Sequence, residues 1–362
     1  MPMSTATTSG SRWTGYAGLL AGFLLLFFLF RDIDLSASLA LVASVGWASP
    51  LVLVPWGMLN LLETLGWRRV FPPGTRRIPF SSLFNLQLIS ETVSMSVPAG
   101  IAVGEPLRPF FCARVLGIGY PAGVASVIVR RLVLGLSQGL YTVLGAAAGF
   151  GFLQGGAAGL AGFGALGWIM ILSGAAVAVV FGILLLALLE GGAASGLHRF
   201  LMAVPFRRLR ERLLEKEKAF HQTDRELESF RAGGMPGIAV SVCYYTLSWA
   251  MLAVESYLVL RLLGADLSFS SVLAIDVSVT LLRTAVFFIP AGLGLQDAGF
   301  LFFFRAAAMP DAIVTGGAFV LLKRLREVLW YAAGYLLFYR YGKRFLPGEF
   351  PSGTAGTRGG TS

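Results

Sequence analysis

Long apolar segments separated by short basic ones run along almost the whole sequence. A helix needs roughly 20 apolar residues to cross a hydrocarbon layer about 30 Å thick. Six segments approach or exceed this length, and they cover residues 13–30, 37–62, 122–152, 163–189, 237–263 and 312–338. The pattern predicts an all-α, polytopic integral membrane protein.

Two further apolar regions are each divided into two short arms by a segment rich in glycine and proline. The first region has arms at 80–97 and 107–116, and the second has arms at 272–289 and 299–308. Each arm is too short or too polar for a comfortable span, so the pattern favours two re-entrant helical hairpins. A simpler interpretation treats every arm as a span and gives roughly eight to ten membrane helices.

The connecting segments of the two hairpins resemble each other. Pro98–Gly100 recurs as Pro290–Gly292, 192 residues later, and the acidic residues Glu105 and Asp297 follow at the same spacing. The residues expected at the hairpin tips are Pro98, Gly100, Gly104, Pro290, Gly292 and Gly294. The alternative is that the Pro-Ala-Gly sequence only kinks two ordinary helices.

A further match lies downstream, where Arg130–Leu132 corresponds to Lys323–Leu325 at a spacing of 193 residues. The first hairpin follows a basic loop, whereas the second follows a span that starts on the side of that loop. The second hairpin is therefore expected to enter from the opposite face. We expect residues 37–152 and 237–338 to be inverted repeat units, an architecture found in many secondary transporters.

The composition supports the membrane assignment. Apolar residues make up 56% of the chain and charged residues 13%, about half the charged share of an average soluble protein. The net charge of +10 comes from basic clusters beside apolar segments, which is typical of cytoplasmic loops and argues against nucleic-acid binding. The distribution places both termini in the cytoplasm and the protein in the cytoplasmic (inner) membrane.

Few residues are available for metal or nucleotide chemistry. The chain has two cysteines and two histidines, without metal-ligand spacing, and no glycine run has the pattern of a nucleotide-binding loop. We therefore expect no metal and no cofactor.

The chain divides into one membrane domain and two tails. Residues 13–346 form the membrane domain, and residues 1–12 and 347–362 are expected to be disordered. The polar stretch 197–233 carries charges of mixed sign three and four residues apart, which predicts a cytoplasmic amphipathic helix.

Thirteen ionisable residues lie within or beside the apolar segments. They are Glu91, Glu105, Arg108, Arg130, Arg131, Glu255, Asp276, Arg283, Asp297, Lys323, Arg324, Arg326 and Glu327. A charge at the bilayer centre costs at least roughly 2.5–3.5 kcal/mol, so these side chains must pair with one another or face a hydrated interior. One interpretation is a purely structural network, for example with Glu91 paired to Arg283, or with Arg324, Arg326 and Glu327 joining helices.

The other interpretation is an anion site. Arginines held together in a medium of low dielectric constant repel unless an anion joins them, and a guanidinium matches phosphate oxygens well. The candidate lipid-headgroup ligands are Arg108, Arg130, Arg131, Arg283, Lys323 and Arg324. The candidate gating residues, which would carry protons or act as charge partners, are Glu91, Glu105 and Asp297.

Four segments give the chain a family resemblance. Residues 96–117, 127–139, 287–300 and 321–330 resemble the flippase-like membrane domain of the lysylphosphatidylglycerol synthetase family, most closely its stand-alone, hopanoid-biosynthesis-associated branch. The family pattern maps onto Pro98, Gly104, Glu105, Arg108, Pro290, Gly292, Gly294, Asp297 and Arg324.

The resemblance implies that the protein binds or translocates a lipid between membrane leaflets. The lipid would be a phospholipid, a polyprenyl phosphate or a hopanoid-type lipid, and lipid-biosynthesis enzymes would be possible partners. The 362 residues leave no room for the soluble aminoacyl-transfer domain of the full-length synthetases, so that activity is not expected. Two alternatives stay open: a non-transporting accessory protein of a lipid pathway, and a membrane-embedded lipid transferase.

Overall fold

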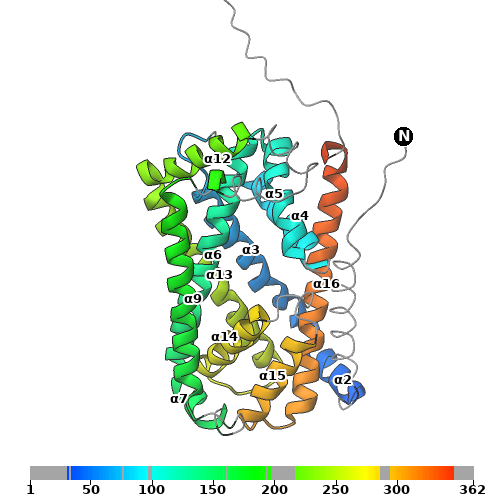
Figure 1. The fold of residues 1–362 in the computed structure, drawn as a ribbon. Coiled ribbons are helices and arrows are strands. Elements are labelled where there is room, and N and C mark those ends of the chain that lie inside the picture. Colours follow the sequence, from blue (N-terminus) through cyan, green and yellow to red (C-terminus); the bar gives the residue numbers. More distant parts are fainter. Residues whose placement is uncertain are drawn as a thin grey trace, which may run out of the picture.

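The fold is known from a computed structural model (Figure 1). The structure describes residues 31, 34–75, 77–96, 100–157, 159, 162, 164–192, 194–196, 217–285 and 294–345. All regular structure in these ranges is helical, which confirms the predicted all-α class.

Twelve α-helices and three short irregular helical segments can be delimited in the described residues. In chain order they are α2 (Leu35–Val45), η1 (Gly46–Val52), α3 (Leu53–Arg69), α4 (Phe80–Ser96), α5 (Gly100–Leu116), α6 (Tyr120–Ala148), α7 (Phe150–Phe152), η2 (Leu153–Ala157), α9 (Leu166–Leu189), α12 (Glu217–Ser229), η3 (Phe230–Gly234), α13 (Met235–Leu262), α14 (Phe269–Ala285), α15 (Leu295–Ala306) and α16 (Ala312–Phe345).

Four helical stretches in the described chain are long and apolar enough to cross a membrane. They are Leu35–Arg69, Tyr120–Ala148, Leu166–Leu189 and Lys218–Leu262. They correspond to predicted spans, although the first is divided at Pro50 by the 3-10 segment η1. The helix α16 is also long, but its central residues 323–327 include four charges, so it is not apolar enough by the same measure. The predicted span 13–30 lies outside the described residues.

The long helices pack side by side as a bundle (Figure 1). The helices α6 and α9 pack along their length, and α13 packs against α3 and α6. Contact between α6 and α9 is close because Gly139 faces Gly174: a Cβ on Gly139 would lie 2.7 Å from the Gly174 carbonyl oxygen.

The two pairs of shorter helices occupy opposite ends of the bundle (Figure 1). The chain enters α4 near Ile78 and leaves α5 near Ile118, and both residues belong to a buried apolar cluster at the α12 end. It enters α14 near Val272 and leaves α15 near Phe304, and both belong to a second cluster at the α7 end. Each pair thus begins and returns at one end, and its two helices pack against each other.

The prediction for the first tip was partly wrong. We expected a connecting segment from residue 98 to residue 105, but α5 already begins at Gly100 and includes Gly104 and Glu105. Pro106 and Pro109 lie inside α5 as well, because α4 and α6 pack around this helix and hold it in shape. The residues between α4 and α5, Pro98 included, lie outside the described chain.

The second tip is described only at its end. Gly294 has a φ of +76°, a conformation that favours glycine, and it immediately precedes α15. Pro290 and Gly292 lie outside the described residues, as do the two predicted tails, residues 1–12 and 347–362.

The predicted amphipathic segment 197–233 is described only in part, and that part includes the helix α12. Leu227 at its end and Phe230 in η3 are buried in the apolar cluster at that end of the bundle, whereas Lys218 and Arg225 are exposed. Residues 197–216 of this segment lie outside the described chain.

Candidate functional site

Polar and ionisable side chains gather in two buried clusters. The α4–α5 cluster consists of Glu63, Gln87, Glu91, Glu105, Arg108 and Arg130. The α14–α16 cluster consists of Glu255, Asp276, Arg283, Asp297, Lys323, Arg324, Arg326 and Glu327.

Arg108 of the α4–α5 cluster is almost fully buried and is surrounded by acceptors. Its Nη1 donates to Gln87 Oε1 over 2.6 Å, and its Nε lies 3.3 Å from a Glu105 oxygen. Its Nη2 lies 3.6 Å from Glu91. The Trp67 ring covers the guanidinium, with its centroid 5.2 Å from the Arg108 Cζ.

Arg130 is paired in the same way from α6. Its Nη2 donates to Glu63 Oε2 over 2.8 Å, and its Nη1 donates to Glu105 Oε1 over 3.3 Å. The neighbouring Arg131 is half-exposed, and its Nη1 lies 4.0 Å from the same Glu105 oxygen. Tyr245 lies against the other side of Arg130, with its ring centroid 5.8 Å from the Arg130 Cζ.

These contacts make the α4–α5 cluster an internally paired network. Three carboxylates face Arg108, Arg130 and the half-exposed Arg131, so the arginines need no external anion. The hypothesis that a lipid phosphate joins the arginines therefore finds no support at this cluster. Sequence reasoning missed Glu63, which directly follows the predicted span 37–62, and Gln87, which carries no charge.

In the α14–α16 cluster, Glu255 contacts two basic side chains. Arg326 makes a bidentate contact to it, with Nε–Oε1 and Nη2–Oε2 distances of 2.7 and 3.1 Å. Lys323 Nζ lies 4.0 Å from Glu255 Oε2 and donates to Ser256 Oγ over 3.0 Å. Trp56 covers Arg326, whose Cζ lies 3.9 Å from the ring centroid.

Arg324 is bound by two acids. It donates to Asp297 through Nη2 and to Glu327 through Nη1, the latter over 2.6 Å. Asp297 also accepts from the Gly294 N–H over 3.1 Å at the start of α15. The predicted charge partner Asp297 therefore fastens α15 to α16, and the predicted headgroup ligand Arg324 is already neutralised.

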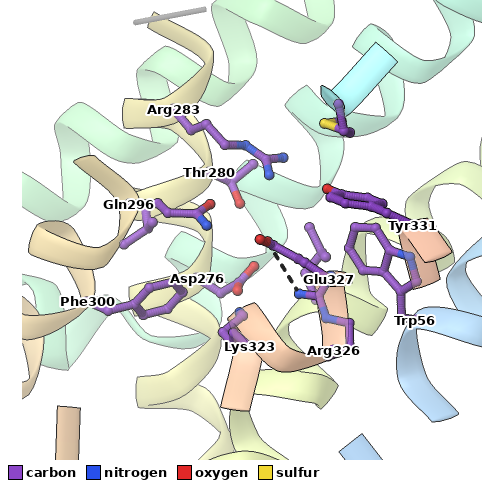
Figure 2. A pocket seen from close by; sticks show the side chains of 13 residues that line it. Trp56, Asp276, Thr280, Arg283, Gln296, Phe300, Lys323, Arg326, Glu327 and Tyr331 are labelled. Atoms are coloured by element: carbon purple, nitrogen blue, oxygen red, sulfur yellow. Dashed lines mark ion pairs between the residues drawn. The ribbon is translucent and has the colours of Figure 1, made fainter. Parts of the chain in front are cut away.

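A pocket opens beside this cluster (Figure 2). It has about 490 Å³ of empty space, part of it open to the outside. Its charged and polar lining comes mainly from one face of α14 and one face of α16: Asp276, Thr280, Arg283, Lys323, Arg326 and Glu327. Its other walls are Trp56, Met95, Leu252, Val279, Gln296, Phe300 and Tyr331. Spacings of three, four and seven residues place each polar set on a single helix face.

Arg283 differs from the other arginines of the clusters. Figure 2 shows its side chain extending from α14 into the pocket. Within the described residues no carboxylate lies within ion-pair distance of it, whereas Arg324 and Arg326 each contact at least one acid at 2.7 Å or less. Within the described chain, Nη1 of Arg326 and Nε of Arg324 are buried without a hydrogen-bond partner.

The six predicted basic ligands do not form one site. Three of them lie in the first half of the chain, namely Arg108, Arg130 and Arg131. The other three lie in the second half, namely Arg283, Lys323 and Arg324. In the described chain, no base of one half forms an ion pair with an acid of the other half. The suggested Glu91–Arg283 pair is wrong, because Glu91 faces Arg108 instead. Tyr331 lies between the clusters and interacts electrostatically with Glu327 and Glu91.

The described residues contain no group of histidine, cysteine, aspartate and glutamate side chains placed to hold a metal ion. The pocket lining offers charged groups of both signs and polar hydrogen-bonding groups. Three aromatic side chains and the Arg283 guanidinium, which has no ion-paired acid in the described chain, suit an amphipathic ligand with an anionic group.

Comparison with known proteins fits this picture. The comparison with curated proteins gives no match. A family model described as the lysylphosphatidylglycerol synthase TM region matches residues 16–333, which is most of the chain. The match and the apolar helices together indicate a multi-pass membrane protein with a lipid-related function. The chain belongs to the family of the lysylphosphatidylglycerol synthase transmembrane region.

Proposed function

We propose that this protein binds a phosphate-bearing lipid by its headgroup in the α14–α16 pocket and moves that headgroup between the membrane leaflets. The observation that carries the proposal is Arg283, a guanidinium that extends into the pocket without an acid within ion-pair distance in the described chain. A phosphate monoester or diester offers the planar pair of oxygens that such a group binds best.

The opposite wall supplies further donors. Lys323 and the unpartnered Nη1 of Arg326 lie on α16, across the pocket from Arg283 (Figure 2). Donors on two sides suit a tetrahedral anion better than a flat carboxylate. A phospholipid or a polyprenyl phosphate fits these donors, whereas a hopanoid-type lipid without an anionic group leaves them unused.

Apolar walls suit the part of the lipid next to its headgroup. Trp56, Phe300 and Tyr331 line the pocket together with aliphatic side chains. The acyl or isoprenoid tail would stay in the bilayer, because its transfer into water costs about 0.8 kcal/mol for each CH₂ group. The protein then has to shelter only the headgroup.

The arrangement of the helices supports a mechanism of alternating access. The pair α4–α5 begins and returns at one end of the bundle, and the pair α14–α15 begins and returns at the other end. Two inverted re-entrant hairpins would have this arrangement. Two ion pairs recur at the repeat spacing: Glu63 contacts Arg130 over 2.8 Å, and Glu255 lies 4.0 Å from Lys323. We propose that one unit rocks against the other and exposes the pocket first to one leaflet and then to the other.

The basic residues orient the molecule in the membrane. Exposed arginines and lysines at the α12 end include Arg68, Arg69, Arg77, Lys218 and Arg225. By the positive-inside rule we propose that this end faces the cytoplasm, and that the membrane is a cytoplasmic (inner) membrane. The α14–α15 pair would then enter from the outer side.

A flipping assay in liposomes tests the proposal. The purified protein is reconstituted with fluorescent phosphatidylglycerol, and the fraction of label that becomes accessible to dithionite is followed with time. Wild type should flip the lipid, Arg283→Gln should slow flipping at least about tenfold because a charged hydrogen bond is lost, and Arg261→Gln, which changes an exposed arginine, should act as wild type.

Other outcomes favour other functions. Flipping by Arg283→Gln at the wild-type rate would refute the pocket as the transport site. A well-folded wild type that flips nothing would favour the accessory protein, and a chemically altered lipid recovered from the liposomes would favour the transferase.

A further inference from the structure

We infer that Asp276 takes up a proton when the pocket binds its anion, so that a phosphate headgroup and a proton occupy the protein together. This inference rests on the proposed function and names the coupling ion that the proposal leaves open. It is based on the balance of charge in the α14–α16 cluster and on the contacts of Asp276.

The α14–α16 cluster as described contains equal numbers of acids and bases. The acids are Glu255, Asp276, Asp297 and Glu327, and the bases are Arg283, Lys323, Arg324 and Arg326. With all of them ionised the cluster is neutral. A phosphodiester anion would leave it with an uncompensated negative charge in a region where charges are costly. One proton taken up by one of the acids restores neutrality.

Contacts within the cluster decide which acid receives the proton. Glu255 is held by the bidentate contact with Arg326, and Asp297 and Glu327 both bind Arg324. Each of these three acids would have to leave a guanidinium in order to be protonated. Asp276 is different, because no basic nitrogen of the described chain lies within 4.0 Å of its carboxylate.

Hydroxyl groups bind Asp276 instead of bases. Tyr141 on α6 donates to Oδ2 over 2.8 Å, and Ser256 on α13 donates to Oδ1 over 3.2 Å. A hydroxyl can accept as well as donate, so either one can reverse its hydrogen bond when the carboxylate gains a proton. The hydrogen-bond partners of the Asp276 carboxyl group therefore suit both of its protonation states.

The groups facing Asp276 from the surrounding helices make its protonation respond to the ligand. Lys323 of α16 reaches it through Ser256, and Arg283, two helical turns along α14, interacts with it electrostatically. Glu255, Arg326, Glu327 and the neutral Gln296 and Thr280 complete its polar surroundings. Without a bound anion, Arg283 and Lys323 stabilise the ionised Asp276 carboxylate. When Arg283 and Lys323 turn to a bound anion, that stabilisation is lost and the proton binds.

The proton balance of the step is simple. One proton leaves the solution and binds an Asp276 oxygen as the anion enters, and it is released when the headgroup leaves on the other side. One negative lipid and one proton thus cross together, and the step moves no net charge.

Binding measurements over a range of pH test the inference. The full-length protein in dodecyl maltoside micelles is titrated with phosphatidylglycerol between pH 5.5 and 8.5, and proton uptake is obtained by calorimetry in two buffers of different ionisation enthalpy. For wild type we expect uptake of about one proton per lipid and a Kd that weakens about tenfold per pH unit on the alkaline side. Inorganic phosphate and diacylglycerol serve as probes without the tail and without the anion.

Matched carboxylate variants identify the group. Asp276→Asn should bind phosphatidylglycerol with a Kd independent of pH and without proton uptake, whereas Asp266→Asn, at an exposed carboxylate, should follow wild type. If wild type binds the lipid without taking up a proton, the inference is overturned by that measurement alone. If Asp276→Asn takes up as many protons as wild type, the inference is overturned as well. Binding of inorganic phosphate as tight as that of the lipid, or no preference for phosphatidylglycerol over diacylglycerol at any pH, would instead refute the proposed lipid function and this inference with it.

Discussion

At the scale of single residues, the partner of each arginine decides its role. Arg326 makes two contacts of 2.7 and 3.1 Å with Glu255, and both side chains are almost fully buried. Such a pair joins α13 to α16, and each charge depends on the other for its burial. Arg283 has no comparable acid among the described residues, so its charge is available to a ligand.

Removing the charge of Glu255 should destabilise the protein strongly. In Glu255→Gln the buried Arg326 and the nearby Lys323 lose their anion, and loss of one partner of a buried ion pair costs about 3–5 kcal/mol. Thermal and urea unfolding in detergent should show this decrease in the free energy of unfolding. Glu228→Gln, at an exposed glutamate of α12, should unfold as wild type does. Equal stability of all three proteins would show that the Glu255–Arg326 pair does not stabilise the bundle.

The sequence predicted part of the site at this scale. A charge inside an apolar segment must face inward, so the burial of Arg108, Arg130 and Asp297 could be anticipated. Which acid meets which base could not be, because pairing depends on helix rotation and contact. For that reason Glu91 was matched with the wrong arginine, whereas Glu63 was missed because it directly follows the predicted span 37–62.

At the scale of helices, small residues determine how closely the short pairs pack. Gly104 of α5 faces Ser94 of α4, and a Cβ at position 104 would lie 1.7 Å from the Ser94 Oγ. The glycine is therefore required by a close approach of two helices. Its place in a segment rich in glycine and proline predicts a residue of the hairpin tip, whereas the structure shows that it matters for packing.

A methyl group at this position should separate the two helices. Gly104→Ala should lower the free energy of unfolding by about 1–3 kcal/mol, which is the usual cost of overpacking, as measured by unfolding in detergent. Gly151→Ala is the control, because nothing lies within 4 Å of its added Cβ. The double variant Gly104→Ala/Ser94→Gly removes the hydroxyl and should recover part of the loss. No loss in Gly104→Ala would contradict the close contact.

The helix boundaries show where hydropathy succeeds. The long apolar segments 122–152, 163–189 and 237–263 correspond to α6, α9 and α13. An uninterrupted apolar segment of this length is typical of a membrane-spanning helix. The start of α5 was placed too late because Gly100 and Gly104 suggested that the connecting segment extends to residue 105, and Pro106, which normally breaks a helix, lies directly after it. Here the neighbouring helices α4 and α6 stabilise the helix around Pro106 and Pro109.

At the scale of the whole molecule, the account depends on the two short helix pairs and the pocket beside the second of them. The pairs begin and return at opposite ends of the bundle, and Met95 of α4 lines the same pocket as Arg283 of α14. The first pair therefore reaches the pocket of the second. A ligand in this pocket contacts both halves of the chain, which is what a rocking mechanism requires.

The most direct test of this arrangement is the accessibility of four single cysteines in spheroplasts. The native cysteines are first removed by Cys112→Ala and Cys243→Ser. Each of four variants then carries a single new cysteine. Two of these positions, Arg77 and Tyr120, flank α4–α5, and the other two, Asp266 and Arg305, lie before α14 and near the end of α15. A membrane-impermeant maleimide should label positions 266 and 305 in intact spheroplasts and positions 77 and 120 only after permeabilisation. Labelling of 77 and 120 from different sides, or of all four positions from the same side, would contradict two hairpins that enter the membrane from opposite faces.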